Sequence, residues 1–145
     1  MRLWHKDLIP VLPRKQLAGQ WRECCLIAKN IYDKGTPNHV LVNKIMDYEP
    51  SHFYNYCLLV AQELSLRYNY KCDWLKIKKY FTPSGVYKNG FMQCIQHEEL
   101  FKEWHDDRYL WQCYYNLQEK HDCGAINDKE WKPILDCCWD RLLRR

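Results

Sequence analysis

Long hydrophobic runs are missing from this 145-residue sequence. No apolar stretch approaches the roughly 20 residues that a membrane-spanning helix needs, and the opening MRLWHKDLIP is too short and too polar for a signal peptide. The apolar–polar alternation of half-buried strands is nearly absent, and there are no repeats or domain-scale linkers. We therefore expect one compact all-α domain over residues 1–145, a cytoplasmic monomer without membrane contact.

Cysteines are plentiful, but the CxxC spacing of redox and zinc motifs is absent. The nine cysteines are an odd number, and the adjacent pairs Cys24–Cys25 and Cys137–Cys138 fall in helical patterns. We interpret the thiols as reduced and mostly buried, where they act as small apolar side chains. Cys94 and His97 could contribute to a zinc site, but no ligand spacing supports one, so we expect no metal or organic cofactor.

A large charge of either sign is missing as well. The net charge of +4 permits binding to a phosphate backbone without demanding it. Aromatic residues, in contrast, are abundant, with seven tryptophans and eleven tyrosines. We expect some of them in the core and others on the surface, where they could serve as stacking platforms.

Hydrophobic periodicity predicts three long helices and several short ones, preceded by an extended segment over residues 1–12. Helices are expected over residues 13–32, 38–46, 51–68, 72–81, 97–120 and 128–143. Ser51 is the expected N-cap of the helix that it begins, and Pro133 is expected to interrupt or kink the last helix. The side chains expected to face inward in the short helices include Val40, Leu41 and Leu75.

Two loops have compositions that suggest a function. TPSGVYKNG, residues 82–90, includes Lys88, which could touch a ligand. EKHDCGAINDKE, residues 119–130, has part of the spacing of a calcium loop but lacks oxygen ligands at two of its places. We interpret it as a helix–turn–helix in which Gly124 ends one helix and Asn127 caps the next.

The helix around Glu23 is the most informative stretch. Leu17 and Trp21 belong to its apolar face, whereas Glu23 shares another stripe with Gln16 and Gly19. Gly19 has no side chain, so a ligand could approach Glu23 closely. Glu23 is therefore either a surface carboxylate on an amphipathic helix or an acid–base group beside a flat patch.

The start of the chain carries a family resemblance. MRLW is followed by the pattern LxxxWRE, which comprises Leu17, Trp21, Arg22 and Glu23. Together these motifs resemble the pyrimidine-dimer DNA glycosylases, small helical repair enzymes of phage and bacteria that are also called dimer-specific endonuclease V. GTPNH at residues 35–39 and SHFYNY at residues 51–56 are similar to stretches of the same family, and the resemblance extends over residues 1–75.

The resemblance implies a reaction in which the N-terminal amine and a glutamate act together. In the family, the amine attacks C1′ of the damaged nucleotide, the base leaves, a Schiff base forms, and β-elimination cuts the strand. An α-amine suits this task because its pKa is about 8, against about 10.4 for lysine, so more of it is unprotonated at pH 7. By resemblance, Met1 supplies the nucleophile, Glu23 is the acid–base group, and damaged double-stranded DNA is the partner.

The same resemblance, with side-chain chemistry, indicates further candidate DNA contacts: Arg2, Gln16, Gly19, Arg22, His39, Lys88 and His97. Arg2 and Arg22 would bind phosphate or sugar beside the extruded nucleotide, and Gln16 and Gly19 would form a floor for the sugar. His39 and His97 could position a phosphate or a water, but a structural role fits each of them equally well.

Departures from the phage pattern leave two other functions open. Gln16 stands where the phage enzyme has a histidine, and Leu26 stands where it has an arginine. One alternative is a non-enzymatic module that binds nucleic acid or protein. The other is an N-glycosidase for a different modified base.

Overall fold

Every regular element in the described residues of the computed structural model, 1–81 and 92–144, is a helix, as predicted. The α-helices are α1 (Arg14–Lys34), α2 (Pro50–Tyr68), α3 (Trp74–Lys78), α4 (Asp107–Asp122) and α5 (Asp128–Leu143). The 3-10 helices are η1 (Lys6–Val11), η2 (Asn43–Asp47), η3 (Lys79–Phe81) and η4 (His97–Glu99). None of the helices in these ranges is long and apolar enough to cross a bilayer.

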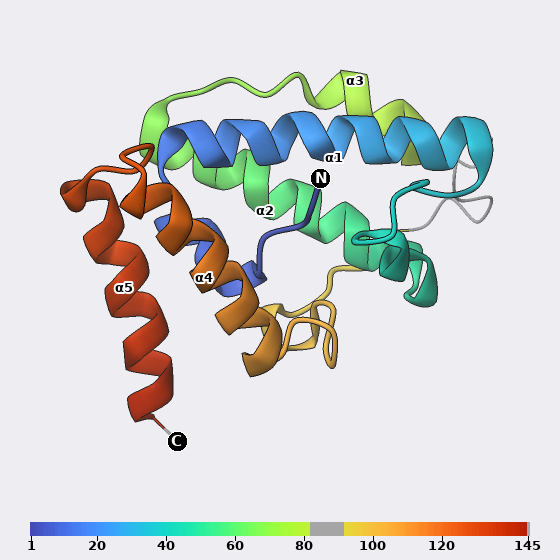
Figure 1. Ribbon diagram of the computed structural model, residues 1–145. Coiled ribbons are helices and arrows are strands. Elements are labelled where there is room, and N and C mark those ends of the chain that lie inside the picture. Colours follow the sequence, from blue (N-terminus) through green and yellow to red (C-terminus); the bar gives the residue numbers. More distant parts are fainter. Residues whose placement is uncertain (82–91, 145) are drawn as a thin grey trace.

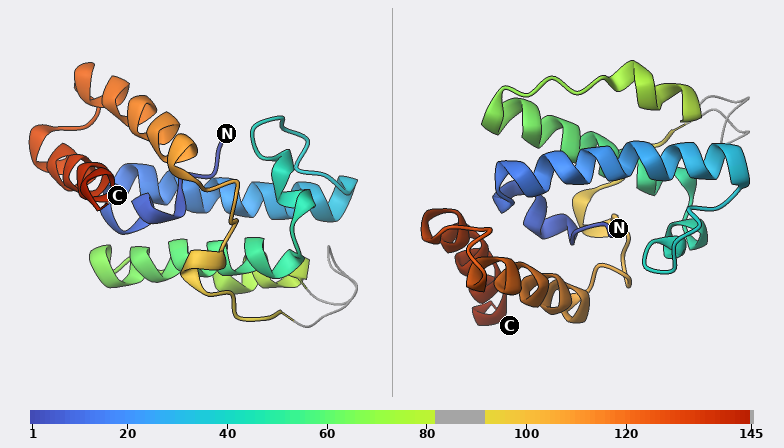
Figure 2. Two further views of the ribbon diagram at one scale, coloured as in Figure 1. Left: turned by 90° about the horizontal axis from the view of Figure 1, so that it is seen from below. Right: turned by 45° about the horizontal axis from the view of Figure 1, so that its top comes forward.

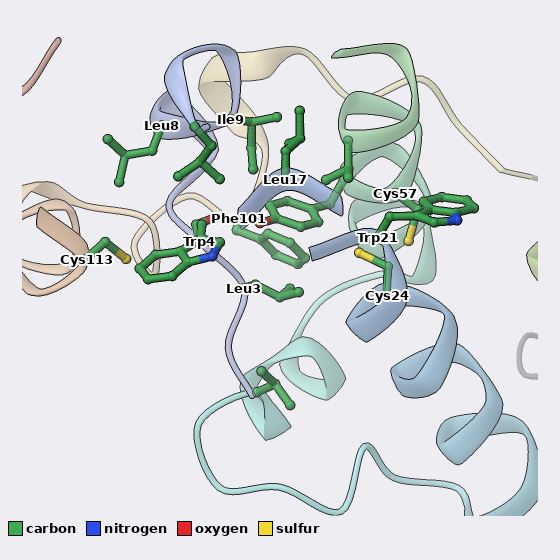
Figure 3. Close-up of a cluster of buried hydrophobic side chains, with 14 of the residues drawn as sticks. Leu3, Trp4, Leu8, Ile9, Leu17, Trp21, Cys24, Cys57, Phe101 and Cys113 are labelled. Carbon is green, nitrogen blue, oxygen red and sulfur yellow. Dashed lines mark hydrogen bonds between the residues drawn. The ribbon is translucent and has the colours of Figure 1, made fainter. Parts of the chain in front are cut away.

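The N-terminal segment connects two pairs of packed helices. α1 packs against α2, α4 packs against α5, and η1 contacts both α2 and α5 (Figures 1 and 2). Leu3, Leu8 and Leu12 are fully buried. Leu3 and Trp4 lie among side chains of α1, α2 and the region around α4 (Figure 3). Burial of this segment fixes where the chain begins relative to α1.

The prediction of an extended segment is wrong for its second half. Residues 1–5 have no regular structure, but Lys6–Val11 form η1. The backbone N–H of Leu12 donates to the carbonyl of Leu8 at 2.9 Å. This turn brings Leu8, Ile9 and Leu12 onto one buried side, which a straight strand with alternating faces would not do.

Helix α1 confirms the predicted first helix. It follows Pro13 and ends at Gly35, whose φ of 75° is the left-handed conformation that favours glycine. Trp21 is buried and stacks on Trp74 of α3, with ring centroids 6.1 Å apart. The predicted apolar face is buried as a whole: Leu17, Trp21, Cys24, Ala28 and Ile31.

The short helix expected over residues 38–46 is mostly a turn. Only Asn43–Asp47 are helical, as η2, and Asn38 has a φ of 57°. Val40 is 83% exposed and Leu41 is 51% exposed, so the prediction that they face inward is wrong. Ile45, the third residue of this stretch that is predicted to face inward, is buried as predicted. Val42 is buried in place of Val40 and Leu41, because the turn shifts which residues face the core.

The helix expected over residues 97–120 is broken into two. η4 ends at Glu99, and Phe101 and Glu103 have φ values of 49° and 76°, which a right-handed helix does not contain. Tertiary hydrogen bonds replace the helical ones, since the Lys6 ammonium donates to the carbonyl of Leu100 at 2.7 Å and the Tyr48 hydroxyl donates to that of Lys102 at 2.6 Å. α4 begins only after Asp106, whose side chain accepts from the Tyr109 N–H.

Three local predictions also differ from the structure. Ser51 does not cap α2, which begins at Pro50; its hydroxyl accepts the Gln93 N–H at 2.9 Å. Leu75 is 77% exposed. α5 continues through Pro133, so the predicted interruption does not occur.

The predicted helix–turn–helix is confirmed. Gly124 has a φ of 86° after the end of α4, and Asn127 caps α5 in a reciprocal capping box with Glu130. The loop that carries Lys88 lies outside the described residues. All nine cysteines are free, as expected, but fewer of them are buried than predicted. Four are buried, three are half-buried and two are exposed: Cys24, Cys57, Cys113 and Cys138; Cys25, Cys72 and Cys137; and Cys94 and Cys123.

Two buried histidines, His5 of the N-terminal segment and His105, lie against each other with ring centroids 5.1 Å apart. His5 accepts the Asp7 N–H at Nδ1, so its proton is on Nε2, which donates to the His105 carbonyl at 2.8 Å. His105 accepts the Lys6 N–H at Nδ1, and its buried Nε2 has no hydrogen-bond partner among the described residues. Burial, aided by the nearby Arg141, lowers the pKa of His5 from 6.5 to about 3, and burial also lowers the pKa of His105.

We expect the protein to lose stability as the pH falls below 6.5. The folded state keeps His5 neutral to about pH 3, whereas the unfolded chain takes up a proton below about pH 6.5. Stability is therefore complete above pH 6.5 and declines by up to about 1.4 kcal/mol per pH unit below it for this residue. Urea unfolding at pH 7, 6 and 5 measures the slope, which should be shallower in His5→Gln, and an equal slope in the variant would contradict the assignment.

Candidate active site

Glu23 of α1 contacts the first two residues of the chain. Its Oε1 lies 3.9 Å from the Met1 amine nitrogen, and its Oε2 accepts the Arg2 backbone N–H at 3.2 Å. The Glu23 side chain is 35% exposed and that of Met1 is 15% exposed, so the pair is sheltered but open to solvent. An amine and a carboxylate are thus held together, which is the combination that a reaction with an amine nucleophile and a proton carrier requires.

Gln20 determines the register between the N-terminal segment and α1. This side chain is 1% exposed; its amide donates to the Arg2 carbonyl at 3.0 Å, and its carbonyl accepts the Trp4 N–H at 2.7 Å. The Tyr56 hydroxyl of α2 lies 2.6 Å from the Trp4 carbonyl, and the Tyr109 hydroxyl of α4 donates to the Leu3 carbonyl. The sequence did not identify Gln20, Tyr56 or Tyr109 as part of the site. A polar glutamine beside Trp21, on a face predicted to be buried, could have indicated a buried hydrogen-bonding side chain.

We expect Gln20→Leu to destabilise the fold and to weaken the site. The substitution leaves the buried Trp4 N–H and Arg2 carbonyl without their partner, which costs about 1–3 kcal/mol. Urea unfolding measures the loss, and Gln62→Leu on the exposed side of α2 is the matched control. Equal stability of the two variants would show that Gln20 does not hold the segment.

Gly19 and Arg22 share one surface of α1. Arg22 is exposed, and its Nη2 lies 3.6 Å from where a Cβ on Gly19 would be. Gln16, one turn earlier, is half-buried. The patch at Gly19 is therefore not bare, contrary to the prediction, because the Arg22 guanidinium lies over it, where it could pair with a phosphate.

We expect Gly19→Ala to stabilise the protein while lowering any activity that needs this patch. The added Cβ meets Arg22 only at ordinary contact distance, and alanine in a helix interior is favoured over glycine by about 0.5–1 kcal/mol. Thermal unfolding and strand cleavage measured on the same variant separate the two effects. Higher stability with unchanged cleavage would exclude Gly19 as part of the substrate floor.

Arg2 is directed toward α4. Its guanidinium carbon lies 5.3 Å from the centre of the Trp4 ring. The side chain lines a pocket of about 330 Å³ together with Leu41, Tyr109, Gln112 and Asn116. This pocket extends the candidate site away from Glu23 to the surface between α4 and the turn before η2.

The two candidate histidines, His39 and His97, do not contact Met1 or Glu23. Each of them bonds to another part of the fold. His39 Nδ1 accepts the Leu41 N–H at 3.3 Å within the turn before η2. His97 Nε2 lies 2.7 Å from Asp7 Oδ1, and both line a separate pocket with Arg141. Within residues 1–81 and 92–144, no three His, Cys, Asp or Glu side chains gather closely enough to hold a metal ion.

The amino-acid sequence matches the model of one known protein family. The model of the family described as pyrimidine dimer DNA glycosylase matches residues 1–76, just over half of the chain. The chain belongs to the pyrimidine dimer DNA glycosylase family. No curated protein and no solved structure matches it.

Membership in the pyrimidine dimer DNA glycosylase family implies a DNA repair glycosylase that acts on damaged DNA. The matched region contains both residues of the amine–carboxylate pair as well as Gln20 and Arg22. Tyr109, Gln112 and Asn116, in contrast, come from α4, beyond the match. The pair therefore lies in the family region, while one wall of the adjacent pocket comes from the rest of the chain.

Proposed function

We propose that the protein is a DNA glycosylase with abasic-site lyase activity, in which the Met1 amine is the nucleophile and Glu23 is the acid–base group. The observation that carries the proposal is the distance of 3.9 Å between the Met1 nitrogen and the Glu23 carboxylate. The family match supports damaged, pyrimidine-dimer-type DNA as the substrate.

The first half of the reaction replaces the base with the amine. The neutral amine attacks C1′, and the bond between C1′ and the base nitrogen breaks, so the base leaves with that electron pair and then gains a proton. Glu23 takes the proton that the amine loses and delivers a proton to O4′ as the sugar ring opens. The product is a Schiff base between the Met1 nitrogen and C1′.

The second half cuts the strand. Removal of a proton from C2′ by the Glu23 carboxylate moves its electron pair toward the iminium, and the 3′ phosphate leaves by β-elimination. Water then hydrolyses the imine and restores the amine. The positive charges of Arg2 and Arg22 suit the phosphates that flank the reacting sugar.

Incubation with three duplexes tests the proposal against its rivals. The substrates contain a pyrimidine dimer, an abasic site or another modified base, and gel electrophoresis measures strand cleavage. Cleavage of the dimer and abasic duplexes supports the proposal. Release of only a different base would favour the alternative N-glycosidase, and tight binding without cleavage of any duplex would favour a binding module.

A further inference from the structure

The backbone at the start of the chain is anchored to α4 at Leu3. Leu3 is fully buried, and its carbonyl accepts a hydrogen bond from the Tyr109 hydroxyl, 106 positions away in the sequence. Because consecutive Cα atoms are about 3.8 Å apart, the Met1 Cα lies within roughly 8 Å of the Leu3 Cα. A contact at Leu3 therefore limits where the N-terminal amine can be.

Tyr109 is itself held firmly in α4. Its backbone N–H donates to the Asp106 side chain at 2.8 Å at the start of this helix. Its ring packs against the rings of His105 and Trp104, with centroids 4.9 Å and 5.8 Å away. Burial raises the pKa of Tyr109, so the phenol keeps its proton and remains a hydrogen-bond donor at neutral pH. The bond to Leu3 thus comes from a fixed group.

Two different helices hold consecutive residues of the N-terminal segment. Gln20 of α1 bonds to the Arg2 carbonyl and to the Trp4 N–H. The Leu3 carbonyl, which lies between them in the chain, bonds instead to Tyr109 of α4. Loss of this bond would leave a buried carbonyl without its partner, which favours a shift of the segment toward water.

The position of the amine beside Glu23 depends on this segment. The Met1 nitrogen lies 3.9 Å from Glu23 Oε1, which is longer than a hydrogen bond. The amine is therefore placed mainly by the residues that follow it, and less by a direct bond to the carboxylate. Precise placement matters, because a displacement of about 1 Å can cost about 10²-fold in rate.

We propose that Tyr109 is a positioning residue, which holds the Met1 amine beside Glu23 through its bond to the Leu3 carbonyl. The inference deepens the proposed function and rests on it for the roles of the amine and the carboxylate. It assigns a task to α4, which lies beyond the region that the family model matches. Tyr109 acts through the backbone of Leu3 and not on the reacting atoms.

Tyr109→Phe tests the inference, because it removes the hydroxyl and keeps the ring. Single-turnover cleavage of an abasic duplex at saturating protein should be slower by about tenfold, because the amine spends less time at its working position. The protein concentration that gives half of the maximal rate should stay within about twofold, since the hydroxyl bonds to Leu3 and not to the substrate. Circular dichroism checks that the variant is folded.

Two control variants separate positioning from a loss of stability. Ile134→Val removes one buried methylene from α5, and its effect on stability should be similar in size to the loss of one hydrogen bond. Tyr115→Phe removes a hydroxyl from a 57% exposed ring of α4. Both controls should cleave like wild type, and urea unfolding measures the stability of each variant. Cleavage by Tyr109→Phe equal to that by Ile134→Val would overturn the inference, as would a raised half-saturating concentration with an unchanged rate.

Acetylation of the Met1 amine gives a readout that needs no reaction with DNA. The protein is treated briefly with dilute acetic anhydride, and mass spectrometry compares the labelling of Met1 with that of the exposed Lys129. Tyr109→Phe should raise the relative rate at Met1 by roughly threefold or more, because the released segment opens more often. Faster acetylation in this variant, with no trapped adduct and no cleavage by wild type, would refute the proposed function and leave the positioning role standing. Equal acetylation in Tyr109→Phe and Ile134→Val would overturn the positioning role.

Discussion

Blocking the Met1 amine is expected to abolish the borohydride-trapped adduct with abasic DNA. An acetylated amine has no basic lone pair and cannot form a Schiff base. A Gly-Ser extension before Met1 retains an α-amine but moves it away from Glu23, to which the Met1 nitrogen lies 3.9 Å distant. Both changes should therefore remove covalent trapping and strand cleavage, which gel electrophoresis measures.

The control for this experiment is the same Gly-Ser extension placed after Arg145. It adds the same residues and should leave trapping unchanged. Circular dichroism of the N-terminally extended protein shows whether the helices persist, since the Met1 side chain is 15% exposed and packs against the core. Full trapping by a folded, N-terminally blocked protein would exclude the amine as the nucleophile.

Glu23→Gln is expected to lower strand cleavage by about 10²–10⁴-fold, the range for loss of a positioned acid–base group. The substitution preserves shape, and the amide oxygen can still accept the Arg2 N–H that Oε2 accepts at 3.2 Å. The variant should therefore keep the N-terminal segment in place and lose only the proton transfers. Single-turnover cleavage of an abasic duplex measures the effect without the base-release step.

Glu63→Gln on α2, at another half-buried glutamate, is the matched control and should cleave like wild type. DNA binding by the Glu23→Gln variant distinguishes a loss of proton transfer from a loss of substrate contacts. DNA binding by Glu23→Gln should be retained, because removing a negative charge beside a phosphate does not weaken phosphate contacts. Cleavage within about threefold of wild type would show that proton transfer does not depend on Glu23.

The sequence alone predicted the helix that carries the candidate site, while the roles of Met1 and Glu23 stay predictions. Periodicity placed Leu17 and Trp21 on the buried face of α1 and left Glu23 beside Gly19, because a single amphipathic helix is a local pattern. Family resemblance supplied the link between Glu23 and Met1, which are 22 positions apart. The structure places their charged groups 3.9 Å apart.

What the sequence could not predict depends on contacts between distant segments. Gln20 bonds to the backbone of Arg2 and Trp4, and helical periodicity does not encode such a partner. The break between η4 and α4 depends in part on Lys6 and Tyr48, whose side chains bond the carbonyls of Leu100 and Lys102 from elsewhere in the fold. Local propensity favours one helix there, and tertiary hydrogen bonds override it.

The turn at Val40 and Leu41 is another place where contacts outside the local pattern decide which residues are buried. Helical spacing predicts both residues to be inward, but Asn38 adopts a φ of 57° and the Asn43 side chain closes the turn. A left-handed residue reverses which side chains reach the core, and asparagine tolerates that conformation better than most residues.

The most direct test of the account is to locate the covalent bond. Wild-type protein is trapped on an abasic duplex with borohydride, digested, and sequenced by mass spectrometry. The account predicts a single modified peptide that begins with Met1 and carries the sugar remnant on its α-nitrogen. A remnant on a lysine side chain, with the Met1 amine unmodified, would contradict it.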